Sequence, residues 1–309
     1  MERTAILCDL LGVRYPLMQG GMAHISDARL AAAVSNGGGL GIISAASGNI
    51  QQIADQIDEA RRLTDKPFGV NIMLRGENID AIAKLIAEKK VAVVTTGAGS
   101  PAAYIPMWRE AGVKVIPVIS TAAMAQLMEK SGADAVVAEG TESGGHVGEM
   151  TTMALVPQVC DAVKIPVIAA GGIADGRGFA ASLMLGACGV QIGTRFLAAE
   201  ECSISEEYKT RVLKAKDTST VVTGRRLGHP VRSLKSAFSR AYAKAEYTDI
   251  SDEDLEAMAV GTLRAAVVDG DPKKGCFLAG QISGLVEKEQ PAAEIIAEIM
   301  KQAESLLCE

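Results

Sequence analysis

Short runs of apolar and β-branched residues recur along the chain at a regular interval. Between them, apolar residues return every three or four positions, as Ile50, Ile53, Ile57 and Ala60 do, which is typical of an amphipathic helix. The starts of the runs lie about 25 residues apart, a spacing that suits one strand, one helix and two short loops. The eight expected strands are Tyr15–Gln19, Gly39–Ser44, Phe68–Leu74, Val91–Thr96, Lys114–Ser120, Ala135–Glu139, Pro166–Gly171 and Gly189–Phe196.

Eight strand–helix units in succession predict an α/β protein with the (β/α)8 (TIM) barrel fold. The strand candidates are apolar on both faces, as expected of parallel strands covered by helices. An open, doubly wound sheet is the alternative arrangement of the same units. In a barrel, the reacting groups are expected at the C-terminal ends of the strands.

The regular spacing ends after Phe196. Residues 200–270 show no clear pair of strands, and we expect residues 200–275 to form a small helical insertion after strand eight, on the substrate side of the barrel mouth. Residues 1–199 and 276–309 would form the barrel, with a last helix from Pro291 to Leu307 completing it. The helices expected within the insertion are Tyr208–Lys216, Val231–Glu246 and Asp252–Val268.

Composition narrows the possible partners. The 309 residues include 31 basic and 37 acidic side chains, a net charge of −6, which argues against a dedicated nucleic-acid binder. No apolar stretch approaches the length of a membrane span, and the N-terminus lacks the layout of a signal peptide. We therefore expect a cytoplasmic protein with no membrane contact. The six cysteines form no C-x-x-C pair and the three histidines have no second ligand at metal spacing, so no metal site is expected.

The last two strand ends carry glycine-rich loops. Gly171 and Gly172 follow the seventh strand, and Gly193 and Thr194 follow the eighth. Backbone N–H groups in adjacent loops of this kind bind phosphate, although glycines also serve simply to make tight turns. A Walker-type loop is excluded because no Gly-Lys dipeptide occurs, and a Rossmann dinucleotide site has no support.

His146 is the main candidate for acid–base chemistry. It lies in the segment Ser143-Gly-Gly-His-Val-Gly148, in the loop after the sixth strand. An imidazole titrates near neutrality and passes protons in both directions. The alternative is a surface or capping histidine. A hydrolase is disfavoured because no G-x-S-x-G motif or other Ser/His/Asp arrangement occurs.

Taken together, the strand-end motifs closely resemble those of the FMN-dependent enoyl-acyl-carrier-protein reductases of type II. These enzymes belong to the wider nitronate monooxygenase (2-nitropropane dioxygenase-like) family of flavin barrels. The resemblance runs from about residue 5 to residue 300 and is specific because eight motifs occur in order. They are Gln19-Gly-Gly-Met22, Asn71-Ile-Met-Leu74, Thr95-Thr-Gly-Ala-Gly99, Glu139-Gly140, Gly144-Gly-His146, Ala169-Ala-Gly-Gly-Ile-Ala174, Gln191-Ile-Gly-Thr-Arg-Phe196 and Ala279-Gly-Gln281.

The resemblance implies FMN as the bound cofactor, NADH or NADPH as the hydride donor, and an enoyl-acyl carrier protein as the substrate. It implies His146 as the catalytic residue, the insertion as a lid over the substrate channel, a homodimer, and a monovalent cation as a further cofactor. The basic stretch of the insertion from Arg211 to Lys244 would suit an acidic carrier protein, although it also fits ordinary solvated helix faces. The positions implied to contact FMN are Gly20, Gly21, Met22, Asn71, Thr96, Glu139, Gly144, Gly145, Gly171, Gly172, Gly193, Thr194 and Gln281.

Three alternatives remain open. The first is a nitronate monooxygenase, in which a histidine at the same place abstracts a proton and oxygen reoxidises the flavin; that branch typically has glutamine at the position of Glu139. The second is a flavin-free barrel similar to the inosine-phosphate dehydrogenases, but the cysteine loop of those enzymes has no counterpart here. The third is a flavin-binding barrel without catalytic activity.

Overall fold

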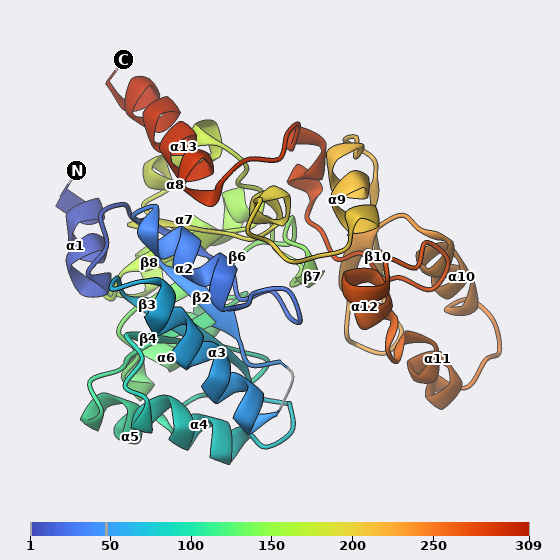
Figure 1. Cartoon of the computed structure of the whole chain (residues 1–309), viewed down its shortest axis with the longest axis horizontal. Helices are drawn as coiled ribbons and strands as arrows, with labels where there is room; N and C mark the ends of the chain where they lie inside the picture. Colours follow the sequence, from blue (N-terminus) through green and yellow to red (C-terminus); the bar gives the residue numbers. More distant parts are fainter. Residues whose placement is uncertain (1, 47–48, 309) are drawn as a thin grey trace.

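The computed structural model describes residues 2–46 and 49–308, so residues 1 and 309, the outer limits of the two expected barrel segments, lie outside it. Within this part of the chain, eight parallel strands form one sheet in the order β1-β9-β8-β6-β5-β4-β3-β2 (Figure 1). These strands are β1 (Leu17–Gln19), β2 (Gly41–Ser44), β3 (Phe68–Met73), β4 (Val93–Gly97), β5 (Lys114–Ile119), β6 (Val136–Glu139), β8 (Val167–Ala170) and β9 (Gly189–Ile192).

The sheet closes on itself where β1 meets the start of β2. The amide of Gln19 donates to the carbonyl of Leu40, and the amide of Leu40 donates to the carbonyl of Leu17, both at 2.9 Å. The sheet is therefore a TIM barrel, which confirms the predicted fold and excludes the open doubly wound sheet. All eight predicted strands are present, and no strand end differs from its expected position by more than four residues.

Helices surround the barrel and the C-terminal helix α13 (Ala292–Leu307) packs against both α8 and α2 (Figure 1). Its N-cap is Pro291, one position before the first helical residue at which the proline was expected. The other helices of the barrel wall are α2 (Ala28–Asn36), α3 (Ile50–Leu63), α4 (Ile79–Glu88), α5 (Ile105–Glu110), α6 (Ala122–Ser131), α7 (Thr152–Ala162) and α8 (Gly176–Met184).

One end of the barrel is filled by apolar packing. Helix α1 (Glu2–Leu11) inserts Leu7 and Leu11 into a buried cluster with Met18, Ile42 and Val137, which come from three different strands. A Cβ on Gly189 would lie 2.5 Å from Leu7, so the helix sits directly against this strand. Because this end is closed by side chains, a site can form only at the opposite end, where the strands finish.

The insertion is not entirely helical, and the prediction for its central part is wrong. Strands β10 (Thr220–Thr223) and β11 (Val231–Leu234) pair antiparallel, and β11 also pairs with β7 (Gly145–His146) from the barrel. The helix expected to begin at Val231 begins only after Ser236, whose hydroxyl caps α10 (Ala237–Ala245). The β-branched run Thr220-Val-Val-Thr223 was the overlooked local signal.

The remaining elements of the insertion are helical and lie beyond the barrel, on the side away from both chain termini (Figure 1). They are α9 (Glu206–Leu213), α11 (Asp252–Ala259), α12 (Thr262–Arg264) and the π-helical turn η2 (Ala265–Asp269); two 3-10 turns, η1 (Thr194–Ala198) and η3 (Gln281–Leu285), flank the insertion. None of the helices described in residues 2–46 and 49–308 is both long and apolar enough to cross a membrane.

Candidate active site

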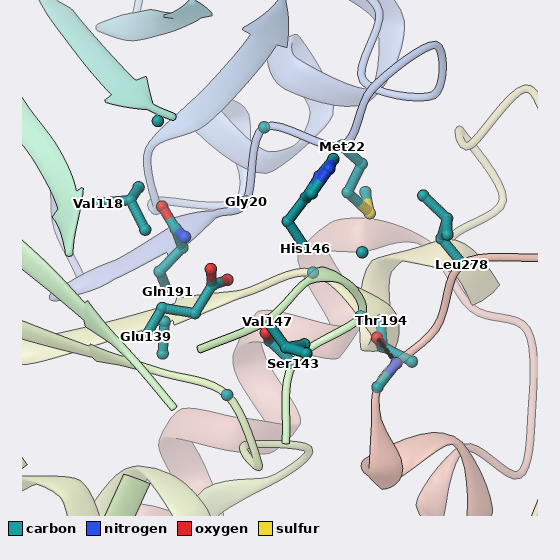
Figure 2. A pocket seen from close by; sticks show the side chains of 18 of the residues that line it. Gly20, Met22, Val118, Glu139, Ser143, His146, Val147, Gln191, Thr194 and Leu278 are labelled. Atoms are coloured by element: carbon teal, nitrogen blue, oxygen red, sulfur yellow. Dashed lines mark hydrogen bonds between the residues drawn. The ribbon is translucent and has the colours of Figure 1, made fainter. Parts of the chain in front are cut away.

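A cavity of about 430 Å³ opens at the C-terminal ends of the strands. This volume falls in the range that holds a cofactor or drug-sized ligand. Its lining comes from the ends of several strands, from the β7 segment and from the segment that returns from the insertion to α13. Figure 2 shows Glu139, Gln191, Thr194 and His146 entering this space from different elements.

The glycines of the cavity are of two kinds. A Cβ on Gly21 would lie 2.3 Å from the Asn71 side chain, and one on Gly144 would lie 2.7 Å from the Ala279 backbone, so both positions allow close contact between segments of the protein. A Cβ on Gly172 or Gly193 would meet nothing nearer than 3.5 Å. Glycine at these two open positions leaves the backbone bare toward the cavity, which fits a ligand lying directly on the main chain.

The end of the cavity near β8 and β9 has the features of a phosphate site. Gly171 and Gly172 both adopt positive φ values, +88° and +77°, which turns the chain sharply after β8. Thr194, directly after Gly193, presents a hydroxyl that accepts the amide N–H of Gly280 at 2.8 Å. The Thr194 O–H proton is free of that bond and is available to a ligand oxygen.

The N-terminus of helix α8 is already occupied by protein groups. Asp175 accepts from the amides of Arg177 and Gly178, and the amide of Gly176 donates to Gln302. The phosphate site expected from the sequence therefore depends on the loop amides around Gly171 and Gly193 rather than on the end of this helix.

Beside the loop after β9, the loop after β1 is held in place from within the barrel, and a Cβ on Gly20 would lie 3.6 Å from the Cα of Gly193. The buried side-chain amide of Gln19 donates through Nε2 to the carbonyl of Gly20 at 2.5 Å and to the hydroxyl of Ser26 at 2.6 Å. The Ser26 hydroxyl in turn accepts the amide N–H of Met22 at 2.9 Å. Asn71 completes this wall, donating to the Gly21 carbonyl at 3.5 Å. These bonds give the 20–22 segment a fixed shape before any ligand arrives.

Glu139 lies on the cavity floor at the end of β6. Burial raises the pKa of its carboxyl group from 4.5 to about 7, and the nearby Ser143 hydroxyl opposes this rise. The Ser143 hydroxyl is itself buried and makes no hydrogen bond of normal geometry with any described residue. A carboxyl group that is partly protonated at neutral pH and a hydroxyl that lacks a partner suit a ligand with its own polar atoms at this depth.

His146 is exposed at the rim of the cavity, in the short strand β7. Packing around the imidazole lowers the pKa of His146 below its ordinary 6.5, and positive charge on His229 and Arg75 lowers it further. The imidazole is therefore mostly neutral at pH 7, with one nitrogen that donates and one that accepts. In this state it can donate a hydrogen bond to a developing negative charge or accept a proton.

Twelve of the fourteen predicted site residues line this one cavity. They are Gly20, Gly21, Met22, Asn71, Glu139, Gly144, Gly145, His146, Gly171, Gly172, Gly193 and Thr194.

Two predicted contacts lie outside the cavity lining. Thr96 is buried in β4; neighbouring strand residues alternate in direction, and it is Thr95 whose hydroxyl donates to Asn71 at 2.9 Å. Gln281 carries an exposed side chain, and its amide N–H donates to the carbonyl of Glu142 at 2.9 Å. In this structure Gln281 thus supports the loop after β6 through its backbone.

Several lining residues were not among the predicted contacts. The polar ones are Ser120, Glu142, Ser143 and Gln191. The alternation of residues along β9 could have found Gln191. Glu142 and Ser143 lie in the loop after β6, where their place between the Glu139-Gly140 and Gly144-Gly-His146 motifs was the available signal. The apolar wall had no such signal, because it is assembled from a strand, a helix and the returning segment. It includes Val118, Ile119, Met124, Leu278 and Ile282.

No group of three or more His, Cys, Asp or Glu side chains able to hold a metal ion occurs in the part of the chain that the structure describes. The polar groups that line the cavity are backbone amides, side-chain hydroxyls, side-chain amides, one imidazole and carboxyl groups. This set, with bare glycine backbone at one end and an apolar wall at the other, fits a phosphorylated, flat organic cofactor beside an apolar substrate.

Comparison with known proteins agrees with this class of site. The chain is 48% identical to FabK from Thermotoga maritima, whose structure superposes with a TM-score of 0.95 over 97% of this chain and 96% of that one. It is 29% identical to a nitroalkane oxidase from Streptomyces ansochromogenes, with a TM-score of 0.88 over 98% and 99% of the two chains. A probable nitronate monooxygenase from Staphylococcus aureus is 35% identical, covering 97% of this chain and 98% of its own length.

A further relative, from Mycobacterium tuberculosis, is a dehydrogenase named for an indene carboxyl-CoA substrate; it is 34% identical over 98% of this chain and 97% of its own length. The fold and cavity thus define a flavin-dependent oxidoreductase built on a TIM barrel. The profile of the family described as nitronate monooxygenase matches residues 4–84 and 75–302, and the chain belongs to that family. Membership implies FMN as its flavin.

Proposed function

We propose that this chain is an FMN-dependent enoyl-acyl-carrier-protein reductase that uses NADH or NADPH and acts in fatty acid elongation. The observation that carries the proposal is the 48% identity to FabK, an enoyl-acyl-carrier-protein reductase, sustained over 97% of the chain. The relatives with other names are 29 to 35% identical over a similar length. The net reaction adds a hydride from the nicotinamide to the β-carbon of a trans-2-enoyl thioester and a proton to its α-carbon.

The residues present fit the flavin. The backbone around Gly171, Gly172 and Gly193, with the Thr194 hydroxyl, would hold its phosphate. The fixed segment from Gly20 to Met22, with Asn71, would support its ring. When bound, FMN supplies hydride transfer between the nicotinamide and the enoyl substrate.

The protein side of the reaction centres on His146. Reduction of the enoyl thioester places negative charge on the thioester oxygen, and a neutral imidazole can donate a hydrogen bond to it. In its protonated form His146 can also deliver the proton that the α-carbon needs; it is left neutral and takes up the next proton from solvent. The apolar wall formed by Val118, Ile119 and Met124 would take the acyl chain and exclude water from it.

The decisive test is a two-step reduction without oxygen. One equivalent of NADH or NADPH should bleach the flavin absorbance of the purified protein, and a trans-2-enoyl thioester should then restore it. Recovery only when air is admitted would contradict the proposal. It would instead favour the second candidate, a nitronate monooxygenase. The family profile and the 35% identity to the Staphylococcus aureus protein support that candidate.

Replacement of His146 separates binding from chemistry. His146→Ala should keep its flavin and its bleaching by NAD(P)H, because the imidazole lies at the rim of the cavity. Its rate of enoyl reduction should fall by about 10²- to 10⁴-fold, the usual effect of losing a general acid. An unchanged turnover would remove His146 from the mechanism.

Further expectations concern partners. An acyl carrier protein would deliver the substrate, and the basic stretch from Arg211 to Lys244, which contains one acidic residue, Asp217, offers charge complementarity to an acidic carrier. A homodimer and stimulation by a monovalent cation are further expectations of the family resemblance. Sedimentation and activity assays in sodium against potassium or ammonium salts test these two directly.

A further inference from the structure

The strand that carries His146 belongs to the barrel but is held by the insertion. Strand β7 pairs only two residues, His146 with Val231 and Gly145 with Arg232, both in β11. The amide of Val147 extends this contact by donating to the carbonyl of Pro230 at 3.0 Å. The insertion therefore supplies the backbone partner of His146.

Local sequence gives His146 little support of its own. Gly144 and Gly145 precede it, and Gly145 adopts a φ of +81°. Two successive glycines leave the backbone free to take many directions unless other contacts restrict it. The direction of the imidazole must come from the tethers on either side of this pair.

On the barrel side, the tethers hold Glu142. Its carboxylate accepts the amide N–H of Thr152 at 3.0 Å, and its carbonyl accepts the amide N–H of Gln281 at 2.9 Å. These bonds fix the start of the loop against α7 and against the returning segment. Beyond them, Gly144 packs closely on the backbone of Ala279, and the backbone pairing of Gly145 and His146 comes from β11.

On the insertion side, Arg232 ties the two ends of the loop together. Its side chain is 7% exposed, and its Nε and Nη2 atoms donate to the carbonyl of Thr141 at 3.2 and 3.1 Å. Its Nη1 atom donates to the hydroxyl of Thr220 in β10 at 3.1 Å. No described carboxylate lies within ion-pair distance of Arg232. Burial lowers the pKa of its guanidinium, the negative charge of Glu142 opposes this shift, and these hydrogen bonds satisfy its N–H groups.

We propose that Arg232 is a positioning residue for His146. Its guanidinium donates to the carbonyl of Thr141, and its backbone lies opposite Gly145. The start and the end of the loop between β6 and β7 are therefore held by the same residue of β11. The insertion then orients the reacting imidazole through β11, although none of residues 200–275 lines the cavity. This inference rests on the proposed role of His146 and extends it to a residue 91 positions away from Thr141.

The kinetic test is a double-mutant cycle with a matched control. Arg232→Met should retain flavin and its bleaching by NAD(P)H, while the rate of enoyl reduction falls about 10- to 100-fold, as expected from a misplaced catalytic group. In a His146→Ala background the same change should cost less than about twofold, because the imidazole it positions is gone. Equal losses in both backgrounds would overturn the proposal.

Arg226→Met is the matched control. Arg226 is also an insertion arginine that donates to backbone carbonyls, those of Thr248 and Ile250, but it does not contact the His146 loop. With a carrier-free trans-2-enoyl thioester as substrate, so that the basic stretch of the insertion has no carrier protein to bind, its loss should leave the rate of enoyl reduction within about twofold of the wild type. A loss equal to that of Arg232→Met would show a general effect on the insertion and would overturn the proposal.

A second measurement does not depend on the substrate and keeps the two proposals apart. Hydrogen exchange of the Val147 amide should be about 10-fold faster in Arg232→Met than in wild type, and unchanged in Arg226→Met. Arg232→Lys, which can keep one bond to Thr141, should lie between them. Protection unchanged in Arg232→Met would overturn the inference even if enoyl reduction is confirmed. Loss of protection in a protein that does not reduce enoyl thioesters would refute only the proposed function.

Discussion

The amide N–H of Gly280 donates to the hydroxyl oxygen of Thr194 at 2.8 Å, although 86 residues separate the two. The bond joins the loop after β9 to the segment that returns from the insertion, and both residues line the cavity. Since the Thr194 oxygen accepts this bond, the hydroxyl proton can only be given to a third group. The arrangement prepares a donor for the phosphate of the flavin.

Thr194→Val should weaken flavin binding without unfolding the protein. Valine keeps the shape of threonine but removes both the donor to the phosphate and the acceptor of the Gly280 amide. Loss of one hydrogen bond to a charged group costs about 1.5–3 kcal/mol, or about 10- to 100-fold in the dissociation constant. The dissociation constant is measured by titrating the apoprotein with FMN and monitoring the quenching of flavin fluorescence. Thr194→Ser should bind within a few-fold of wild type, and a Thr194→Val protein with wild-type affinity would contradict the assignment.

Gly171 should tolerate alanine far less well than Gly112 does. Both residues have left-handed backbones, with φ of +88° and +80°, so alanine strains each by about 1–2 kcal/mol. A Cβ on Gly171 would lie 2.7 Å from the carbonyl oxygen of Gly140, whereas one on Gly112 would meet nothing within 4 Å. We expect Gly171→Ala to lose at least about 1 kcal/mol more stability than Gly112→Ala. The measurement is the free energy of unfolding of the two apoproteins in denaturant. Equal losses of stability in the two variants would show that the turn after β8 can shift to accommodate the added Cβ.

The pKa of Glu139 predicts a loss of stability as pH rises. The unfolded chain releases this proton near pH 4.5 and the folded chain near 7, so the folded state binds more protons between those values. Stability contributed by the neutral carboxyl group is full below 4.5 and is lost as pH passes 7. Glu139→Gln removes the titration. Relative to wild type, this apoprotein should therefore gain up to about 3 kcal/mol across the window.

The measurement is the free energy of unfolding of both apoproteins at several pH values. Glu149→Gln, at an exposed carboxylate near the same loop, is the control and should run parallel to wild type. If the Glu139→Gln curve is also parallel to wild type, the folded carboxyl group is not protonated at neutral pH, and the floor of the cavity carries a negative charge.

Arg75→Met should raise the pKa of His146. The positive charge of Arg75 disfavours the imidazolium form of His146, so its removal moves the pKa upward, toward the ordinary value of 6.5. The chain has three histidines, so NMR titration can follow each, with His146 identified from its absence in His146→Ala. Arg226→Met is the control, because Arg226 pairs with Asp252 in the insertion. A downward shift, or none, would mean that Arg75 does not face the imidazole.

The barrel itself could be predicted because its signals are local. Each strand is a short apolar run, each helix a three- or four-residue repeat, and the strand ends of a closed barrel converge on one mouth whatever the loop lengths. That convergence is why glycines and a histidine drawn from distant motifs, such as Gly21, His146 and Gly193, could be placed in one cavity from sequence. Thr96 shows the limit of this reasoning: it belongs to a strand-end motif, but its neighbour Thr95 faces Asn71.

The insertion was decided by tertiary contacts. Residues Val231–Leu234 are compatible with the first turn of a helix, but their backbone pairs on one side with β10 and on the other with Gly145 and His146. The guanidinium of Arg232 meets a carbonyl 91 residues earlier, and no spacing in the sequence indicates such a bond. Periodicity reports which face of an element is buried and how long the element is. It does not report which distant backbone groups pair once the barrel has closed. In this protein such a pairing, between β11 and β7, joins the insertion to His146.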